Sequence, residues 1–300
     1  MEFKTKSIFV AMVGKPNVGK SSLMNLILGE KIAIVTQKPQ TTRTSITGIL
    51  TKGDTQYVFM DTPGIHTPRT KLGERMVKTS HKTIADVDLA VMIFEPYGDI
   101  NDAELSLAES IKKNQIPSIA VINKKDTIKN EEDVQLQIKK IKDIGIFDKV
   151  LLTSAKDNDG VDQLLNTIGE YAIEGPHYFE EDAITNMPEK VIVSEIVREK
   201  LLLNLFDEIP HGTNVEVEKF KERKGKNMVD ISVVIYCERK SHKGMIIGKQ
   251  GAMLKKISSQ ARMDIEQFLG AKVFMECWVK VKEDWRDSNY ILNDFGFKDE

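Results

Sequence analysis

The stretch that most constrains this chain is GKPNVGKS at residues 14–21, which fits the pattern G-x-x-x-x-G-K-[ST]. It follows a short apolar run, IFVAMV, and precedes a run with helical spacing. In that context the glycines let backbone N–H groups turn toward phosphates, and the helix N-terminus adds the positive end of its dipole. The pattern predicts a nucleotide site in which Lys20 reaches the β- and γ-phosphates and Ser21 ligates Mg²⁺. The other loop residues expected to line the nucleotide are Asn17, Val18, Gly19 and Ser22.

The motif NKKD, after an apolar run ending near residue 122, indicates which base is bound. Asn123 can contact the base edge, and the aliphatic part of Lys124 can pack on the ring. Asp126 can accept from two N–H groups that guanine has and adenine lacks, so we expect GTP and GDP as ligands. A later SAK loop would bring the backbone N–H of Ala155 near the guanine oxygen, although an ordinary strand-to-helix loop explains it as simply. The residues expected on the base side are Asn123, Lys124, Asp126, Ser154, Ala155 and Lys156.

The motif DTPG at residues 61–64 predicts the catalytic side of the site. Asp61 would support Mg²⁺, and the Gly64 N–H would face the γ-phosphate. Thr42, within the segment 31–45, stands where a switch threonine would reach the metal, although only the order of the surrounding motifs favours this over an ordinary loop. The expected metal residues are Ser21, Thr42 and Asp61, and the expected catalytic residues are Lys20, Thr42, Asp61 and Gly64.

Ile65 follows DTPG, where Ras-like GTPases carry a glutamine that orients the attacking water. Because isoleucine cannot do this, backbone groups, a partner, RNA or a cation must place the water. Asn17 can help to hold K⁺ against the phosphates, or it can simply be a turn residue that tolerates a strained backbone. In either case we expect slow intrinsic hydrolysis, which suits a switch.

The first half of the chain alternates short apolar runs with helical stretches, which predicts an α/β domain with a mostly parallel sheet. Two runs, SITGILT and QYVFMD, flank the turn signal KGD and predict a hairpin that adds one antiparallel strand. Residues 174–189 contain two prolines and little periodicity and are predicted to be a linker. We therefore expect a GTP-binding domain at 1–173 and a small α+β domain at 190–300.

A second glycine loop, GKQG at 248–251, lacks the G-K-[ST] of a nucleotide loop. Strand and helix patterns around it match the order of a K homology (KH) domain, whose G-x-x-G loop clamps about four nucleotides of RNA. Between residues 239 and 263 there are seven basic residues and no acidic one, a charge pattern that suits a phosphate backbone. The expected RNA-binding residues are Lys243, Ile247, Gly248, Lys249, Gln250, Gly251 and Lys255.

The composition suits a cytosolic protein. The formal net charge is −2, so the basic segment is a local feature. The two cysteines, Cys237 and Cys277, are expected to be buried thiols, and no apolar stretch has the length of a membrane span. Trp278 and Trp285, in and just after the last predicted strand, are expected to anchor the core.

The motifs GKPNVGKSSLMN, PQTTR, DTPGIH, NKKD, SAK, IIGKQG and WVKVKEDWR together resemble the Era family, over nearly the whole chain. These are bacterial GTPases with a C-terminal type II KH domain. The resemblance implies binding near the 3′ end of 16S rRNA, a role in maturation of the 30S ribosomal subunit, and a monomer in the cytoplasm. It leaves room for peripheral association with the inner membrane. The family's usual arginine after the first loop glycine is Lys15 here.

Two other functions remain open from the residues. A GTPase acting on tRNA modification or on another ribosomal particle shares TTR and NVGKS, but the KH segment argues against it. An RNA chaperone with a vestigial GTPase domain is disfavoured by the intact Lys20, Ser21, Asp61 and Asp126. For a switch, we expect the GTP form to bind RNA more tightly than the GDP form.

Overall fold

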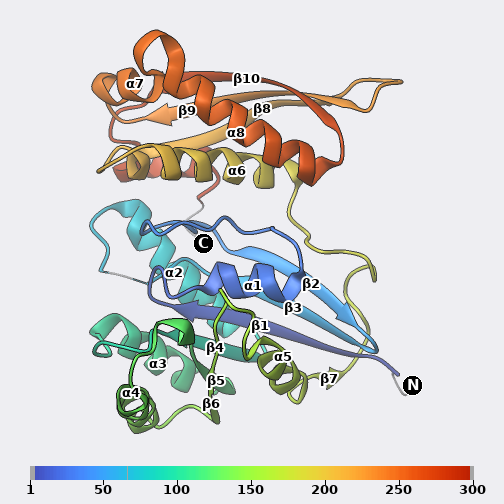
Figure 1. Ribbon diagram of the computed structural model, residues 1–300, viewed down its shortest axis with the longest axis vertical. Coiled ribbons are helices and arrows are strands. Elements are labelled where there is room, and N and C mark those ends of the chain that lie inside the picture. Colours follow the sequence, from blue (N-terminus) through green and yellow to red (C-terminus); the bar gives the residue numbers. More distant parts are fainter. Residues whose placement is uncertain (1–3, 66, 298–300) are drawn as a thin grey trace. The chain divides into compact units, whose positions relative to one another are not determined.

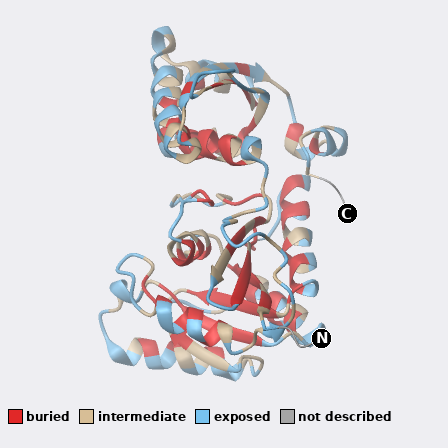
Figure 2. Cartoon of the chain, turned by 90° about the vertical axis from the view of Figure 1, so that its right-hand side faces the viewer, coloured by how far each residue is buried: buried red, intermediate tan, exposed pale blue. Residues whose placement is uncertain are grey.

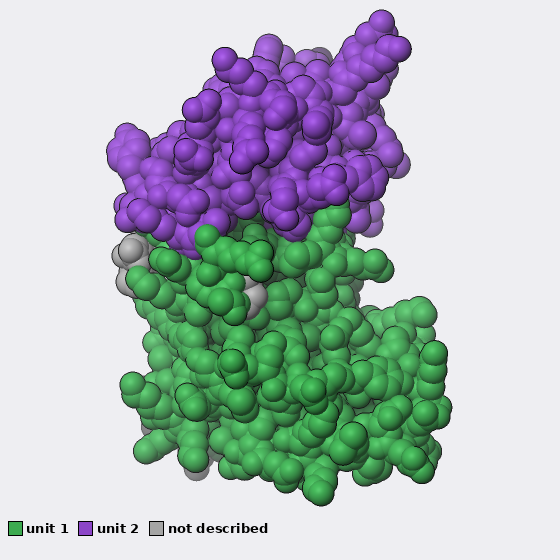
Figure 3. Space-filling model, turned by 90° about the vertical axis from the view of Figure 1, so that its left-hand side faces the viewer, with its two compact units in different colours: residues 1–69, 73–186 green, residues 70–72, 187–300 purple. Residues whose placement is uncertain are grey.

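The computed structural model describes residues 4–65 and 67–297, and the chain divides into two compact units (Figure 3). Unit 1 comprises residues 1–69 and 73–186, and unit 2 comprises residues 70–72 and 187–300. Each unit has its own sheet and its own core, so each is described by itself.

Unit 1 is built on a sheet with the strand order β2-β3-β1-β4-β5-β6, in which β1, β3, β4, β5 and β6 run parallel (Figure 1). The strands are β1 (Lys6–Gly14), β2 (Ile46–Lys52), β3 (Thr55–Asp61), β4 (Leu89–Phe94), β5 (Ser118–Ile122), β6 (Lys149–Leu152) and β7 (Ile173–Glu174). The helices are α1 (Lys20–Leu28), α2 (Lys71–Ala85, which begins within the short segment assigned to unit 2), α3 (Asp102–Lys113), α4 (Glu131–Asp143) and α5 (Val161–Gly169).

The central strands β4 and β5 are buried at every position, as their unbroken apolar sequences require (Figure 2). One face of the sheet packs on α2, α3 and α4 through a core that includes Ile84, Leu107 and Ile141. On this architecture the carboxyl ends of β1, β3, β5 and β6 carry the motifs GKPNVGKS, DTPG, NKKD and SAK. The expected α/β class is therefore confirmed.

The predicted hairpin is β2 and β3, which pair antiparallel with Lys52 opposite Thr55. The two-residue strand β7 adds a second antiparallel pairing, to β1, that the sequence did not indicate. Helix α2 was also not predicted, because its sequence KLGERMVKTSHKTIA is largely charged and polar.

Residues 177–185 follow β7 and lie against β2 and β3. The side chain of Gln56, which is fully buried, accepts from the N–H groups of Tyr178 and Phe179 and donates to the Phe179 carbonyl. Farther along, Ile49 N–H donates to the carbonyl of Ile184 at 2.9 Å. This segment, called the strap below, covers the outer edge of the sheet although its composition indicated a linker.

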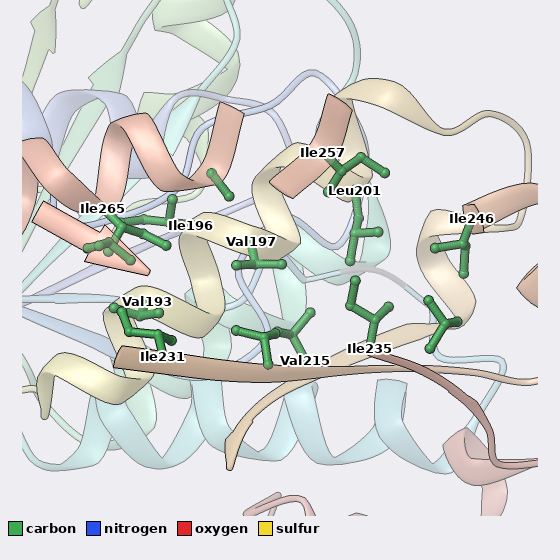
Figure 4. Packing of buried hydrophobic residues seen from close by; sticks show 14 of the residues in the cluster. Val193, Ile196, Val197, Leu201, Val215, Ile231, Ile235, Ile246, Ile257 and Ile265 are labelled. Atoms are coloured by element: carbon green, nitrogen blue, oxygen red, sulfur yellow. The ribbon is translucent and has the colours of Figure 1, made fainter. Parts of the chain in front are cut away.

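Unit 2 has a three-stranded sheet in the order β10-β9-β8, with β10 parallel and β8 antiparallel to β9. Its strands are β8 (Thr213–Glu222), β9 (Met228–Cys237) and β10 (Lys272–Val281), and its helices are α6 (Glu189–Asn204), α7 (Lys240–Ile247), α8 (Ala252–Leu269) and α9 (Asn289–Asp294). Apolar residues of α6, α7 and α8 pack on one face of this sheet (Figure 4). This is the α+β arrangement expected for a KH domain of type II.

The two tryptophans have different environments. Trp285 is fully buried and its indole N–H donates to the carbonyl of Gly212, so it anchors the core as expected. The same expectation is wrong for Trp278, which is 59% exposed. The reason is the alternation of a strand: Cys277 and Val279 face the helical core, so Trp278 faces the other side.

Burial disfavours the reactive thiolate form of both cysteines, because it raises the pKa of each thiol. Cys237 is buried, and Cys277 is half-buried with its pKa raised to about 11 by desolvation. Within the described ranges, no helix combines the length and apolar character needed to span a membrane.

Candidate functional site

The phosphate loop is held in a shape that few residues allow. Gly19, directly before α1, has φ 102°, and a Cβ atom there would lie 2.1 Å from Asn123 Nδ2. Asn17 also has positive φ, at 66°, and its amide nitrogen donates to the carbonyl of Gln37 at 2.6 Å. The turn is therefore specified by residues that accept left-handed backbone or leave room for a neighbour.

The ammonium group of Lys20 lies inside this loop. Its Nζ donates to the carbonyls of Gly14 at 3.2 Å and Lys15 at 2.9 Å, and the residue is 5% exposed. Burial lowers the pKa of Lys20 to about 8, and the nearby Asp61 only partly offsets this. A phosphate group beside Lys20 would favour the charged form, so this lysine suits anion binding.

All three expected metal residues meet in one cluster. Ser21 Oγ donates to Asp61 Oδ2 at 2.5 Å, Thr42 Oγ1 donates to the same oxygen at 3.2 Å, and the two hydroxyls are 3.1 Å apart. Asp61 is completely buried, and burial raises its pKa. Among the described residues, its Oδ1 atom has no hydrogen-bond partner. An unpartnered buried carboxylate oxygen beside two hydroxyls fits Mg²⁺, a hard cation that prefers oxygen ligands.

The loop and the switch segment line one pocket. Its walls come from the phosphate loop, from the segment before β2 and from the DTPG motif; the lining residues are Pro16, Asn17, Gly19, Lys20, Ser21, Ser22, Ile34, Val35, Thr36, Gln40, Thr41, Thr42 and Gly64. Val18 was expected to bind the cofactor, but its side chain is fully buried, so only its backbone can contribute.

Ile65 belongs to the core and not to the pocket. It is 4% exposed, packs in the cluster under α2 and α3, and its N–H donates to the carbonyl of Gly14 at 3.2 Å. An apolar residue at this position thus ties DTPG to the end of β1, and its side chain cannot orient a water molecule.

Asn123 connects the three loops of the site. Its Nδ2 donates to the carbonyl of Val18 at 2.8 Å, and its Oδ1 accepts from Thr153 Oγ1 and from Ala155 N–H, both at 3.1 Å. The residue is 1% exposed. These contacts give Asn123 a positioning role, and its contact with the base edge stays a prediction. The Ala155 N–H, expected near the guanine oxygen, here donates to Asn123.

Asp126 is oriented by its neighbours. Ser154 Oγ donates to Asp126 Oδ1 at 2.9 Å, and Lys156 Nζ lies 3.7 Å from Asp126 Oδ2. Lys124 has φ 64° and forms an ion pair with Glu95 at 2.5 Å. The expected residues of NKKD and SAK therefore come together at the ends of β5 and β6.

One contact of the phosphate loop was not predictable from a motif. Lys15 forms an ion pair at 2.7 Å with Glu104, whose side chain is 3% exposed. Glu104 also completes a capping box with Asn101 at the start of α3. The pattern N-x-x-E marks that helix start, but nothing in it indicates that the carboxylate also pairs with Lys15.

The second glycine loop of the sequence joins α7 to α8 in unit 2. Gly248 has φ 72°, and a Cβ atom there would lie 2.7 Å from the Cβ of Met253. Lys249 and Gln250 at the tip are exposed, and Lys255 is exposed on the first turns of α8. Ile247 and Lys243 are half-buried on α7. The seven expected residues thus lie on one helix–loop–helix segment.

Comparisons with known proteins agree with this geometry. Residues 9–124 match the family described as 50S ribosome-binding GTPase, and residues 208–286 match the KH domain. The chain is 47% identical to the GTPase Era of Ruminiclostridium cellulolyticum over 98% of both chains, and 47% identical to that of Clostridioides difficile over 98% of this chain and 99% of the relative.

Two solved structures are similar over 98% of this chain and 99% of theirs, each with a TM-score of 0.93 and 35% identity. One is Era in complex with MgGDPNP and nucleotides 1506–1542 of 16S ribosomal RNA, and the other is a single-residue variant of Aquifex aeolicus Era bound to GDP and AlF₄⁻. With a phosphate loop, a guanine-type base site and a KH domain in one chain, and with relatives matched from end to end, this protein belongs to the Era family of GTPases.

Proposed function

We propose that this GTPase uses its two glycine loops for two kinds of phosphate, so that unit 1 binds Mg²⁺ with GTP or GDP and unit 2 binds the 3′ region of 16S rRNA. Maturation of the 30S subunit is the process in which such a switch would act. The observation that carries the proposal is the presence of both loops in one chain. Each has the left-handed glycines its shape requires, and each is surrounded by groups suited to its ligand.

In the GTP site, Lys20 would bind the β- and γ-phosphates, and Ser21, Thr42 and Asp61 would hold the metal. Mg²⁺, when bound, neutralises charge that develops on the phosphates. Asp126 would accept from the guanine N–H groups, with Ser154 fixing the carboxylate. Adenine lacks these donors and would leave the Asp126 carboxylate without its partners, so the site selects guanine.

The position of the attacking water needs another group, since Ile65 is part of the core. Asn17 is a candidate for holding K⁺ at the phosphates, because its amide nitrogen donates to Gln37 and so fixes the side chain between the phosphate loop and the switch segment. The left-handed backbone of Asn17 supports the alternative role of a turn residue equally well.

The strap offers a route from the GTP site to the chain that enters unit 2. Thr185 Oγ1 donates to the carbonyl of Thr47 at 2.6 Å, and Thr47 is adjacent to Ile46, which pairs with Asp61 in the sheet. Met187, the first residue of the second part of unit 2, follows two positions later. We therefore expect a movement of β2 that begins at Asp61 to be transmitted through the strap to the segment that connects the two units.

The RNA side is supported by the basic α7–α8 segment and by the relative solved with 16S rRNA nucleotides 1506–1542. We further propose that the protein acts as a monomer in the cytoplasm and that any contact with the inner membrane is peripheral, as the resemblance to Era GTPases implies. A tRNA-modifying enzyme is disfavoured because the relatives match along the whole chain, KH segment included.

The test is RNA binding by variants of the GKQG loop, with a strand matching the 3′ end of 16S rRNA. Gly248→Asp and Gly251→Asp place a carboxylate where the RNA backbone would approach, and binding should fall at least ~10-fold. Gly270→Asp is the matched control for Gly251→Asp, because both glycines have positive φ, at 60° and 81°, with open space around them. Equal losses in all three variants, or no binding by the unmodified protein, would contradict the proposal.

A further inference from the structure

The face of the unit 2 sheet that points away from α6, α7 and α8 carries two exposed aromatic side chains. It is covered at the Tyr236 end, where Phe295 packs on Tyr236 with ring centroids 4.9 Å apart, and the part around Phe274 and Trp278 is called the open face below. Along β10, Val273, Met275, Cys277 and Val279 all pack in the helical core. The alternating positions therefore point away from the helices, and there Phe274 is 51% and Trp278 59% exposed. Neither ring belongs to the GKQG loop, which lies on the helical side.

The spacing of the two rings suits a repeated ligand. Phe274 and Trp278 are four residues apart on one strand, which corresponds to about 13 Å along the sheet. Large aromatic side chains on an open sheet are platforms on which nucleobases stack, because every base presents a flat π-face. An extended single strand would place successive bases along this direction.

Positive charge gathers at the same end of the sheet. Residues 219–227, around the turn from β8 to β9, contain one acidic residue, Glu222, and five basic ones: Lys219, Lys221, Arg223, Lys224 and Lys226. The guanidinium carbon of Arg223 lies 5.6 Å from the centre of the Phe274 ring. This pairing of a cation with an aromatic ring is common where proteins hold single-stranded nucleic acid.

Acidic groups on this face determine where phosphates can lie. Asp230 is neutralised by Arg223 at 2.6 Å and lies 3.9 Å from Lys219, and Glu218 pairs with Lys280 at 3.0 Å. Glu276 stands between the two rings on β10. The phosphates of a bound strand would therefore run along the side of β8, over Lys219 and Lys221, with bases directed toward β10.

We propose that this open face, defined by Phe274, Trp278, Arg223, Lys219 and Lys221, is a second contact surface for single-stranded RNA. It rests on the proposed function, since it takes a part of the RNA that extends beyond the GKQG loop. RNA fits better than an acidic protein segment, because only a strand with bases and phosphates engages both the rings and the cations.

The experiment compares a short and a long RNA, both ending with the strand that fills the GKQG loop. A strand of about six nucleotides fills the loop alone, and one of about 20 can also reach a second surface. The double variant Phe274→Ala/Trp278→Ala should lose ~10–100-fold in affinity for the long strand and keep its affinity for the short one. Tyr290→Ala is the matched control, because this tyrosine is 81% exposed on α9 of the same unit.

A second readout needs no variant. Trp278 is exposed and Trp285 is fully buried, so stacking of a base should quench only the accessible part of the tryptophan fluorescence, and only with the long strand. Equal affinity of the double variant and the unmodified protein for the long strand would overturn this inference, with the GKQG loop intact. Failure of the unmodified protein to bind even the short strand would instead overturn the proposed function.

Discussion

At the scale of single residues, the expected metal-binding residues are the ones whose proximity the motifs predicted best. Ser21, Thr42 and Asp61 come from three separate segments, yet the structure brings all three within hydrogen-bonding distance. Such groups are predictable because ligand chemistry fixes their identity and their order along the chain. Gln56 and Glu104 were not predictable, because their roles depend on partners that only the fold brings close.

The buried carboxyl of Asp61 should make the stability of the nucleotide-free protein depend on pH. Its pKa is raised in the folded state, so the folded protein holds this proton at a pH where the unfolded chain has released it. The contribution of Asp61 is therefore most favourable below its ordinary pKa and is lost as the pH rises through the raised value. Asp61→Asn removes the charge and should stabilise the nucleotide-free protein at neutral pH by ~1 kcal/mol or more.

Chemical unfolding of both proteins at neutral pH and at about pH 4, near the ordinary pKa of an aspartate, measures this difference. The gain of the asparagine variant should shrink at the lower pH, and the variant should no longer be stabilised by Mg²⁺ with GDP. A variant that is less stable than the unmodified protein at neutral pH would mean that the charge is compensated without the metal.

The role of Asn17 is testable through the choice of monovalent cation. If this side chain helps to hold K⁺, GTP turnover should be at least ~10-fold faster in KCl than in NaCl, an effect of about 1.4 kcal/mol on the barrier. Asn17→Gly keeps the left-handed backbone and removes the side-chain oxygen, so turnover should become equal in the two salts. Equal turnover in the unmodified protein would leave Asn17 as a turn residue only.

At the scale of elements, the alternation of apolar runs and helical patterns predicted most of the sheet and most helices. Fully apolar runs such as β4 and β5 have one stable place, the middle of a covered parallel sheet. Helix α2 was not predicted because its buried stripe includes polar residues such as Arg75, Ser80 and Thr83. The composition of the strap indicated a linker. Its hydrogen bonds depend on the long-range partner Gln56, which no local pattern can reveal.

Removing the hydrogen bonds that hold the strap should reduce the effect of the bound nucleotide on RNA affinity. Gln56→Leu keeps the buried volume but leaves the N–H groups of Tyr178 and Phe179 without their acceptor, at a cost of about 1–3 kcal/mol. Hydrogen exchange in residues 177–185 should speed up. The ratio of the RNA affinities of the GTP form and the GDP form should fall toward one, while the affinity for GTP stays unchanged.

The control is Gln137→Leu, which removes another buried glutamine of unit 1, one that donates to the Glu95 carbonyl at 3.3 Å. It should lose stability without affecting the preference of RNA for the GTP form. If both variants kept that preference, the strap would be a passive cover of the sheet edge.

At the scale of the whole molecule, the chain combines a fold that binds a soluble nucleotide with a fold built to hold an RNA strand. The sequence identified both because each depends on a short glycine loop in a defined strand and helix context. It misplaced Trp278, since alternation along β10 decides which tryptophan faces the core and which faces solvent. The exposure of Trp278 matters for RNA binding, because unit 2 then has an aromatic face in addition to the GKQG loop.

The measurement that tests the central claim most directly is the affinity of the unmodified protein for the 3′ strand of 16S rRNA, with a GTP analogue and with GDP. A ligand shifts an equilibrium only by its different affinity for the two states, so a switch requires different RNA affinities. We predict at least ~10-fold tighter binding in the GTP form, a coupling of about 1.4 kcal/mol. Equal affinities in the two forms would leave two independent binding sites and would contradict a GTP-controlled RNA clamp.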